Sequence, residues 1–153
     1  MKIVIGSDHR GFLLKEYIKA NMSKDINFVD VGCYSVDSVD YPLVSKDLVL
    51  KLKEVAEQNG DKEINNTFGI IICGSGVGVS IAVNKFPFIR GALVFNDEVA
   101  KSSRQHNNSN VLCLPADYLS EKQSIQIIKT FITETFEGGR HENRVKELSN
   151  LSC

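Results

Sequence analysis

Short apolar runs alternate along the chain with longer segments whose apolar residues recur at helical spacing. Runs of four to seven residues that are rich in β-branched side chains predict buried strands. The longer segments predict amphipathic helices that cover these strands. The predicted strands are residues 2–6, 27–31, 68–73, 89–95 and 111–114, of which 68–73 is the most apolar and is placed at the centre.

The segments between these strands carry helix signals of their own. Phe12, Leu13, Tyr17 and Ile18 recur at helical spacing. Pro42 suits the first turn of a helix, and Ser120 is a favoured N-cap residue. The predicted helices are 12–19, 42–57, 78–84, 97–105, 120–132 and 141–148.

Strands that alternate with helices, each strand a continuous apolar run, predict an α/β fold with a five-stranded parallel sheet covered on both faces. Ligands of such sheets bind beyond the carboxyl ends of the strands. Polar and glycine-rich residues follow these ends at 7–9, 73–78, 95–96 and after Leu114. The sequence therefore places the functional site at this edge of the sheet.

Composition narrows the class of protein. Hydrophobic residues make up 42% and charged residues 24%, which is typical of a globular protein and not of a disordered chain. Eighteen basic and nineteen acidic residues give a net charge of −1, so a basic footprint for nucleic acid is absent. No apolar stretch approaches the roughly 20 residues that span a bilayer. We expect one domain over residues 1–153, with no nucleic-acid or membrane partner.

The four cysteines, Cys33, Cys73, Cys113 and Cys153, form no CxxC pair for zinc. A chain of this length can bury a core without disulfides. We therefore expect free thiols in a reducing cytosol, and hence a cytoplasmic location.

The turn Gly74-Ser75-Gly76-Val77-Gly78 follows the central predicted strand. Glycines let the backbone approach a ligand closely, and amides at a helix start attract anions. The spacing is neither that of a Walker loop nor that of the dinucleotide-binding G-x-G-x-x-G. A tight turn without a ligand is the alternative.

Cys73 directly precedes this turn. Donors at a helix start favour a thiolate, so this residue is a candidate nucleophile or general base. The alternative is a buried apolar cysteine, which we expect for Cys33 and Cys113. A redox role for Cys73 would lack a resolving cysteine nearby in sequence.

Histidines and arginines supply the remaining candidates. His9 and His106 both adjoin positions predicted to face a ligand, although hydrogen-bonded structural histidines are the alternative. A metal site formed by Asp8, His9, Cys73 and His106 stays open, but no HxxxH or CxxC spacing organises it. Arg140 and Arg144 would share one face of a helix and suit a phosphate, the alternative being a solvated basic face.

Five segments in order along the chain resemble the type B ribose-5-phosphate isomerase family, which also includes the galactose-6-phosphate isomerase subunits. They begin with Gly6-Ser7-Asp8-His9-x-Gly11-Phe12 and Asp40-Tyr41-Pro42, and the third runs from Cys73 to Lys85. The fourth is Arg104-x-His106-Asn107-x-x-Asn110-Val111-Leu112, and the last runs from Phe136 to Arg144. Together they span nearly the whole chain.

The resemblance implies a homodimeric, Rossmann-like three-layer α/β/α sandwich with a C-terminal helix, in which residues 136–153 reach the partner subunit. It implies an isomerase that interconverts ribose 5-phosphate and ribulose 5-phosphate through an enediolate, with no cofactor and no metal. Cys73 would be the base, His106 would open the sugar ring, and Ser75 would help to hold the oxyanion. The substrate-binding residues it implies are Asp8, His9, Tyr41, Gly74, Gly76, Val77, Gly78, Asn107, Arg140 and Arg144.

Two features depart from the family pattern. Asp117 stands where the family commonly has an arginine that can contact phosphate, and the polar loop 58–66 is longer than usual, with no role assigned. An isomerase of a six-carbon substrate, such as galactose 6-phosphate or allose 6-phosphate, stays open. A catalytically silent module that binds sugar phosphate also stays open, as does the pairing of dimers into tetramers.

Overall fold

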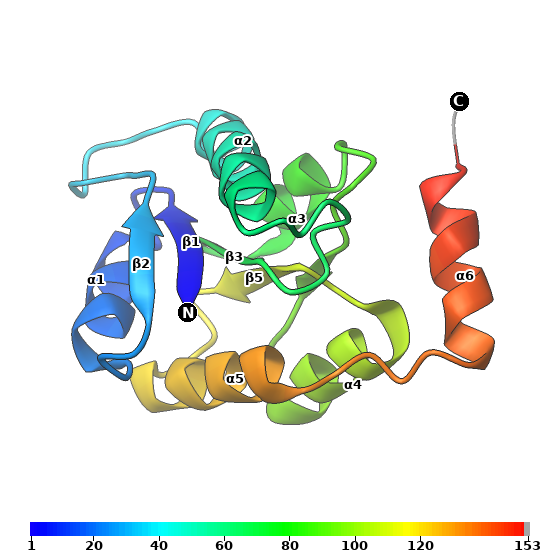
Figure 1. Cartoon of the computed structure of the whole chain (residues 1–153). Helices are drawn as coiled ribbons and strands as arrows, with labels where there is room; N and C mark the ends of the chain where they lie inside the picture. The colour runs from blue at the N-terminus through cyan, green and yellow to red at the C-terminus, as the bar shows by residue number, and fades with distance from the viewer. Residues whose placement is uncertain (152–153) are drawn as a thin grey trace.

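The computed structural model describes residues 1–151, in which five strands form one parallel sheet in the order β2-β1-β3-β5-β4 (Figure 1). This confirms the predicted α/β fold. The strands are β1 Lys2–Ser7, β2 Asn27–Asp30, β3 Phe68–Cys73, β4 Gly91–Leu93 and β5 Val111–Pro115. The helices are α1 Phe12–Asn21, α2 Tyr41–Gln58, α3 Val77–Val83, α4 Asp97–Asn107, α5 Glu121–Thr133 and α6 Arg140–Ser149.

Helices cover both faces of the sheet and make it the middle of three layers. α1, α4 and α5 pack on one face, and α2 and α3 pack on the other (Figure 1). Side chains of β3 alternate between the two cores, with Ile70 and Ile72 in the first and Ile71 and Cys73 in the second. Full burial on both faces explains why the sequence of β3 is a continuous apolar run.

Most element boundaries lie within a few residues of the prediction. Ser120 caps α5 as expected, in a reciprocal capping box with Gln123. The predicted strand 89–95 is too long, since β4 covers only Gly91–Leu93. The hydrogen-bonded pairing of β4 with β5 begins only at Gly91, because the N–H of Arg90 donates to the side chain of Asn110 at 2.9 Å.

The predicted inner face of α1 is partly wrong. Leu13 is 71% exposed, whereas Leu14, Lys15 and Ile18 are buried. Lys15 is fully buried because its Nζ donates to Asp30 of β2 at 2.7 Å and to a nearby carbonyl oxygen. Hydrophobic periodicity does not reveal a buried ion pair. The sequence therefore predicted Leu13 on the inner face of α1 and did not predict Lys15 there.

α6 stands apart from the three layers and touches the remainder of the chain beside α4 (Figure 1). Among its described residues only His141 is buried. Hollows of about 630 and 840 Å³ lie between α6 and neighbouring segments, the first lined by β4 and α4 and the second by the loop before β3. Within residues 1–151, no helix is both long enough and apolar enough to cross a membrane.

Candidate active site

Cys73 ends β3 at the carboxyl edge of the sheet and is only 5% exposed. The backbone N–H of Gly76 donates to its Sγ at 3.1 Å. Because β1 and β3 are parallel neighbours, with Ser7 opposite Ile72, the turn after β1 lies beside this thiol. Sequence analysis placed Asp8 and His9 at this edge, and the structure confirms that placement.

The glycine turn after Cys73 is tightly enclosed. Gly76 adopts a left-handed φ of 72°, and a Cβ there would lie 2.4 Å from Leu93. A Cβ on Gly78 would lie 2.9 Å from the ring of Tyr41, which packs on the turn from the start of α2. Side chains other than hydrogen are therefore excluded where the backbone must approach its neighbours. Ser75 is exposed in this turn, and its Oγ accepts the N–H of Val77 at 3.3 Å.

Polar contacts shape the turn after β1. Asp8 is buried, and its Oδ1 accepts the N–H groups of Arg10 at 2.9 Å and Gly11 at 3.0 Å. His9 accepts the N–H of Val39 at its Nδ1, at 3.3 Å. We call this group the Cys73 half-site; it consists of Asp8, His9, Arg10, Tyr41, the residues 73–78 and Asp117.

Sequence analysis missed Arg10. Its guanidinium group forms an ion pair with Asp117, which follows β5 at the same edge of the sheet. A Cβ on Gly74 would lie 2.6 Å from the guanidinium carbon, so the cation lies directly over the glycine turn. The sequence signal that could have identified Arg10 is its position as a cation directly after Asp8 and His9. Asp117 is thus paired, and its negative charge is balanced by that of Arg10.

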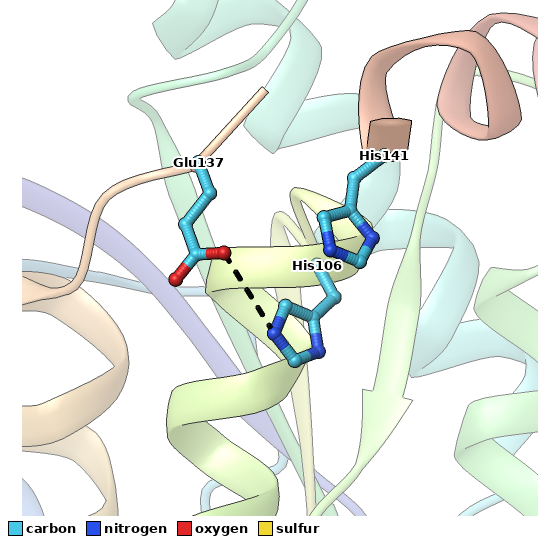
Figure 2. A group of neighbouring side chains, drawn as sticks. All are labelled: His106, Glu137 and His141. Atoms are coloured by element: carbon cyan, nitrogen blue, oxygen red, sulfur yellow. Dashed lines mark ion pairs between the residues drawn. The ribbon is translucent and has the colours of Figure 1, made fainter. Parts of the chain in front are cut away.

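A second cluster of functional side chains gathers at the end of α4 (Figure 2). The imidazole rings of His106 and His141 stack with centroids 4.4 Å apart and planes inclined by 10°. Glu137 lies 3.9 Å from Nε2 of His106, and its backbone N–H donates to the carbonyl of Gln105 at 3.0 Å. We call this group the His106 half-site; it consists of His106, Asn107, Glu137, Arg140, His141 and Arg144.

The His106 half-site is electropositive. Burial lowers the pKa of His141, and the charges of His106, Arg140 and Arg144 lower it further, against the opposing effect of Glu137. Nε of Arg140 donates to Nε2 of His141 at 3.4 Å. Sequence analysis did not single out His141 or Glu137.

The donor atoms of His106, Glu137 and His141 lie within 4.8 Å of one another, and these are residue types that bind zinc. Two features oppose a cation here. One nitrogen of His141 already accepts from Arg140, and the positive charge of Arg144 lies nearby. The charge balance of this half-site suits an anion better than a metal ion.

Within one chain the two half-sites lie at opposite ends of the sheet. Cys73 is level with Pro115 at the carboxyl end, whereas Gly69 is level with Val111 at the amino end. The N–H of Gly69 donates to the carbonyl of Asn110, four residues after His106. Gly69 lies about 13 Å from Cys73 along the strand, at about 3.3 Å per residue, so the segment that follows His106 lies at the amino end of the sheet, away from Cys73.

This arrangement corrects the expectation that His106 adjoins the ligand-binding edge of its own chain. α4 follows a parallel strand and runs back to the amino end, so its last turn lies far from the carboxyl edge. It also answers the question of a metal site formed by Asp8, His9, Cys73 and His106, because one chain does not bring these four residues together.

Comparison with known proteins gives consistent matches over nearly the whole chain. The sequence model of the family described as Ribose/Galactose Isomerase matches residues 3–148. Ribose-5-phosphate isomerase B of Escherichia coli strain K12 is 36% identical over 151 residues, covering 98% of this chain and 95% of the relative.

Solved structures agree with this match. Ribose-5-phosphate isomerase B of Thermotoga maritima superposes with a TM-score of 0.86 at 38% identity, covering 98% of each chain. The enzyme of Mycoplasma genitalium, whose structure contains bound ribulose 5-phosphate, gives a TM-score of 0.82 at 38% identity, covering 97% of this chain and 94% of that one.

Proposed function

The chain belongs to the ribose/galactose isomerase family, and we propose that it interconverts ribose 5-phosphate and ribulose 5-phosphate in a site shared between two copies of the chain. The proposal rests on two findings taken together: the chain matches this family, and its structure contains both the Cys73 half-site and the His106 half-site. Each half-site holds part of the chemistry that an aldose–ketose isomerisation needs. The ribulose 5-phosphate bound to the Mycoplasma genitalium relative supports the choice of substrate.

In the Cys73 half-site the reaction is a proton transfer. Cys73 removes the proton from C2 of the open-chain aldose, and the resulting enediolate carries negative charge on oxygen. A proton passes from the C2 hydroxyl to the oxygen on C1, and Cys73 delivers the proton it holds to C1, which gives the ketose. Amide N–H groups of residues 74–78, together with Ser75, stabilise the developing oxyanion, and preorganised donors of this kind supply most of the rate enhancement in such steps. Asp8, His9 and Tyr41 bind the sugar.

The His106 half-site supplies the steps that precede proton abstraction. His106 opens the furanose ring by moving a proton between the C1 hydroxyl and the ring oxygen, with Asn107 holding the sugar. Arg140 and Arg144 bind the phosphate, since a guanidinium group offers two parallel donors to an oxyanion.

The shared site follows from the position of the reacting atoms. C1 and C2 are bonded to each other, so the group that opens the ring and the group that removes the C2 proton must lie within a few ångströms of one substrate. Cys73 and His106 of one chain lie at opposite ends of the sheet. A homodimer in which α6 and the end of α4 reach the Cys73 half-site of the partner satisfies both requirements.

Exposed apolar side chains beside the Cys73 half-site support a covering subunit. Leu43 of α2 is 63% exposed, Ile81 of α3 is 57% exposed and Phe95 after β4 is 56% exposed. Exposed apolar side chains of this kind can be covered at a protein interface. We propose that residues 1–153 act as one domain per subunit of a cytoplasmic homodimer.

The ion pair between Arg10 and Asp117 bears on substrate preference. The family commonly has an arginine at the position of Asp117, and here the cation at this edge comes from the turn after β1 instead. The Cys73 half-site therefore still presents a positive group over the glycine turn. Because Asp117 balances the charge of Arg10, the phosphate is assigned to Arg140 and Arg144.

Replacement of Cys73 by Ala tests the proposed base. We expect Cys73→Ala to abolish turnover while ribose 5-phosphate still binds, as measured by calorimetry. Cys113→Ala is the matched control, because Cys113 is also buried in the same core on the next strand, level with Ile71 and two residues before the carboxyl edge where Cys73 lies. We expect that control to keep its activity and to lose about 1 kcal/mol of stability. Activity of Cys73→Ala near the wild-type level would refute the assignment.

A further inference from the structure

The loop between α2 and β3 is built around one carboxylate. Asp61 accepts the backbone N–H groups of Asn65 at 2.9 Å and Asn66 at 2.8 Å, and the hydroxyl of Thr67 at 2.9 Å. Burial raises the pKa of Asp61, but these hydrogen bonds outweigh it, so the net pKa is lowered. Ile64 is buried against α2 and neighbouring strands at a left-handed φ of 51°. The loop is therefore a defined structure and not a flexible insertion.

Asn65 joins this loop to the end of α4. Its Oδ1 accepts from Nη2 of Arg90 at 3.0 Å and from Nδ2 of Asn108 at 2.8 Å. Its backbone carbonyl accepts from Nη2 of Arg104 at 3.3 Å. One residue of the loop thus contacts two guanidinium groups and one side-chain amide.

Asn65 provides hydrogen-bond acceptors for the partly buried guanidinium groups of Arg90 and Arg104. Burial lowers the pKa of Arg90, and burial together with the nearby charge of Arg90 lowers that of Arg104 to about 10. Buried donors that lose an acceptor are costly, and most of all when they carry charge. Asn65 supplies an uncharged acceptor between these cations and the loop.

Asn108 directly follows α4, and each of its polar groups forms a hydrogen bond. Its N–H donates to the carbonyl of Arg104 at 3.1 Å, and its own carbonyl accepts from Nε of Arg90 at 2.7 Å. Its Oδ1 accepts from Nη1 of Arg104 at 3.0 Å, and its Nδ2 donates to Asn65. Guanidinium groups can only donate, so these contacts fix the orientation of both amides. They also hold Asn108 at a left-handed φ of 48°.

His106 lies two residues before this clamped position, in the last turn of α4. Its side chain is 42% exposed and rests on the ring of His141. We propose that Asn65 is a positioning residue for His106: the loop before β3 fixes the end of α4, and so sets where the ring-opening imidazole meets the substrate. This inference rests on the proposed function of His106, and it gives the polar loop a role in catalysis.

Three variants test the role of the acceptor oxygen. Asn65→Ala removes the oxygen that Arg90 and Asn108 share, and we expect kcat to fall about tenfold with KM changed less than about threefold, because small displacements of a catalytic group are costly. Asn65→Asp keeps an acceptor oxygen at the same place and should restore most of kcat. Asn66→Ala is the matched control, since this exposed side chain forms no hydrogen bond within residues 1–151; it should behave as wild type.

Imidazole resonances give a readout that does not depend on turnover. The chain has three histidines, so a ¹H–¹³C spectrum of histidine-labelled protein is simple to assign. We expect Asn65→Ala to shift the His106 and His141 signals through their ring stack, and Asn65→Asp to return them towards the wild-type positions. Thermal unfolding of each variant confirms that it is folded.

Two results would overturn the proposal. One is wild-type kcat and unchanged imidazole signals in Asn65→Ala. The other is an equal loss in Asn65→Ala and Asn65→Asp, which would show that the acceptor oxygen, which the aspartate keeps, does not position His106. If the wild-type protein failed to isomerise ribose 5-phosphate, the proposed function would fail, while the imidazole signals would still decide whether Asn65 positions His106.

Discussion

Mixing two inactive variants should restore activity if the site is shared between subunits. Cys73→Ala destroys the Cys73 half-site and leaves the His106 half-site intact, and His106→Ala does the reverse. In a dimer with one chain of each kind, one site combines the two intact half-sites and the other combines the two damaged ones. We expect this outcome because Cys73 and His106 of one chain lie at opposite ends of the sheet.

The size of the effect follows from counting sites. Equal amounts of two freely exchanging chains give dimers of which about half contain both variants, and each of these has one working site of two. The mixture should therefore reach about a quarter of wild-type specific activity, starting from two preparations with almost none. A site contained in a single chain would give no restoration at all.

The assay follows ribulose 5-phosphate formation after the chains are exchanged by mild denaturation and dilution. Mass spectrometry of differently tagged chains shows that mixed dimers have formed. As a control, Cys73→Ala is mixed with a chain that carries both substitutions, so that every site lacks Cys73 and no activity should appear. No recovery from mixed dimers whose formation has been demonstrated would refute the shared site.

Two further predictions concern the His106 half-site. Arg140→Ala and Arg144→Ala should each raise KM about tenfold or more with little change in kcat, as loss of a charged hydrogen bond to phosphate does, and an unchanged KM would contradict the phosphate assignment. Because the pKa of His141 is lowered in the folded protein, the unfolded chain takes up this proton at higher pH, so acidification through the ordinary value of 6.5 should cost stability. His141→Asn should flatten the fall in urea-unfolding free energy between about pH 7 and 5, and a slope equal to that of wild type would contradict this account.

Local patterns were enough to predict the sheet and the place of Cys73, Asp8 and His9 at its carboxyl edge, but not Arg10. The continuous apolar run of β3 predicts a buried strand, and the glycines after Cys73 predict a tight turn. Both signals lie within a few residues of sequence. Ser120 is another such case, because its capping box closes within three residues. Only the limits of β4 and the inner face of α1 departed from expectation, where side-chain partners replaced apolar packing.

Contacts between distant segments could not be predicted in the same way. Arg10 and Asp117 are 107 residues apart, and Asn65 and Asn108 are 43 residues apart. The position of His106 was predictable in principle, since a helix that follows a parallel strand must run back to the amino end of the sheet. His106 comes shortly before β5 in the sequence, but the segment before a parallel strand lies at the amino end of that strand. This position supports the proposal of a second subunit.

Turnover of ribose 5-phosphate by the purified protein in excess EDTA tests the central claim most directly, with galactose 6-phosphate and allose 6-phosphate measured in parallel. The account predicts steady formation of ribulose 5-phosphate that EDTA does not diminish, and little or no turnover of the six-carbon substrates. Activity confined to a six-carbon substrate would keep the shared site and overturn the assigned substrate. Binding of ribose 5-phosphate by a folded protein that turns over none of the three would contradict the account and leave a module that binds sugar phosphate without catalysis.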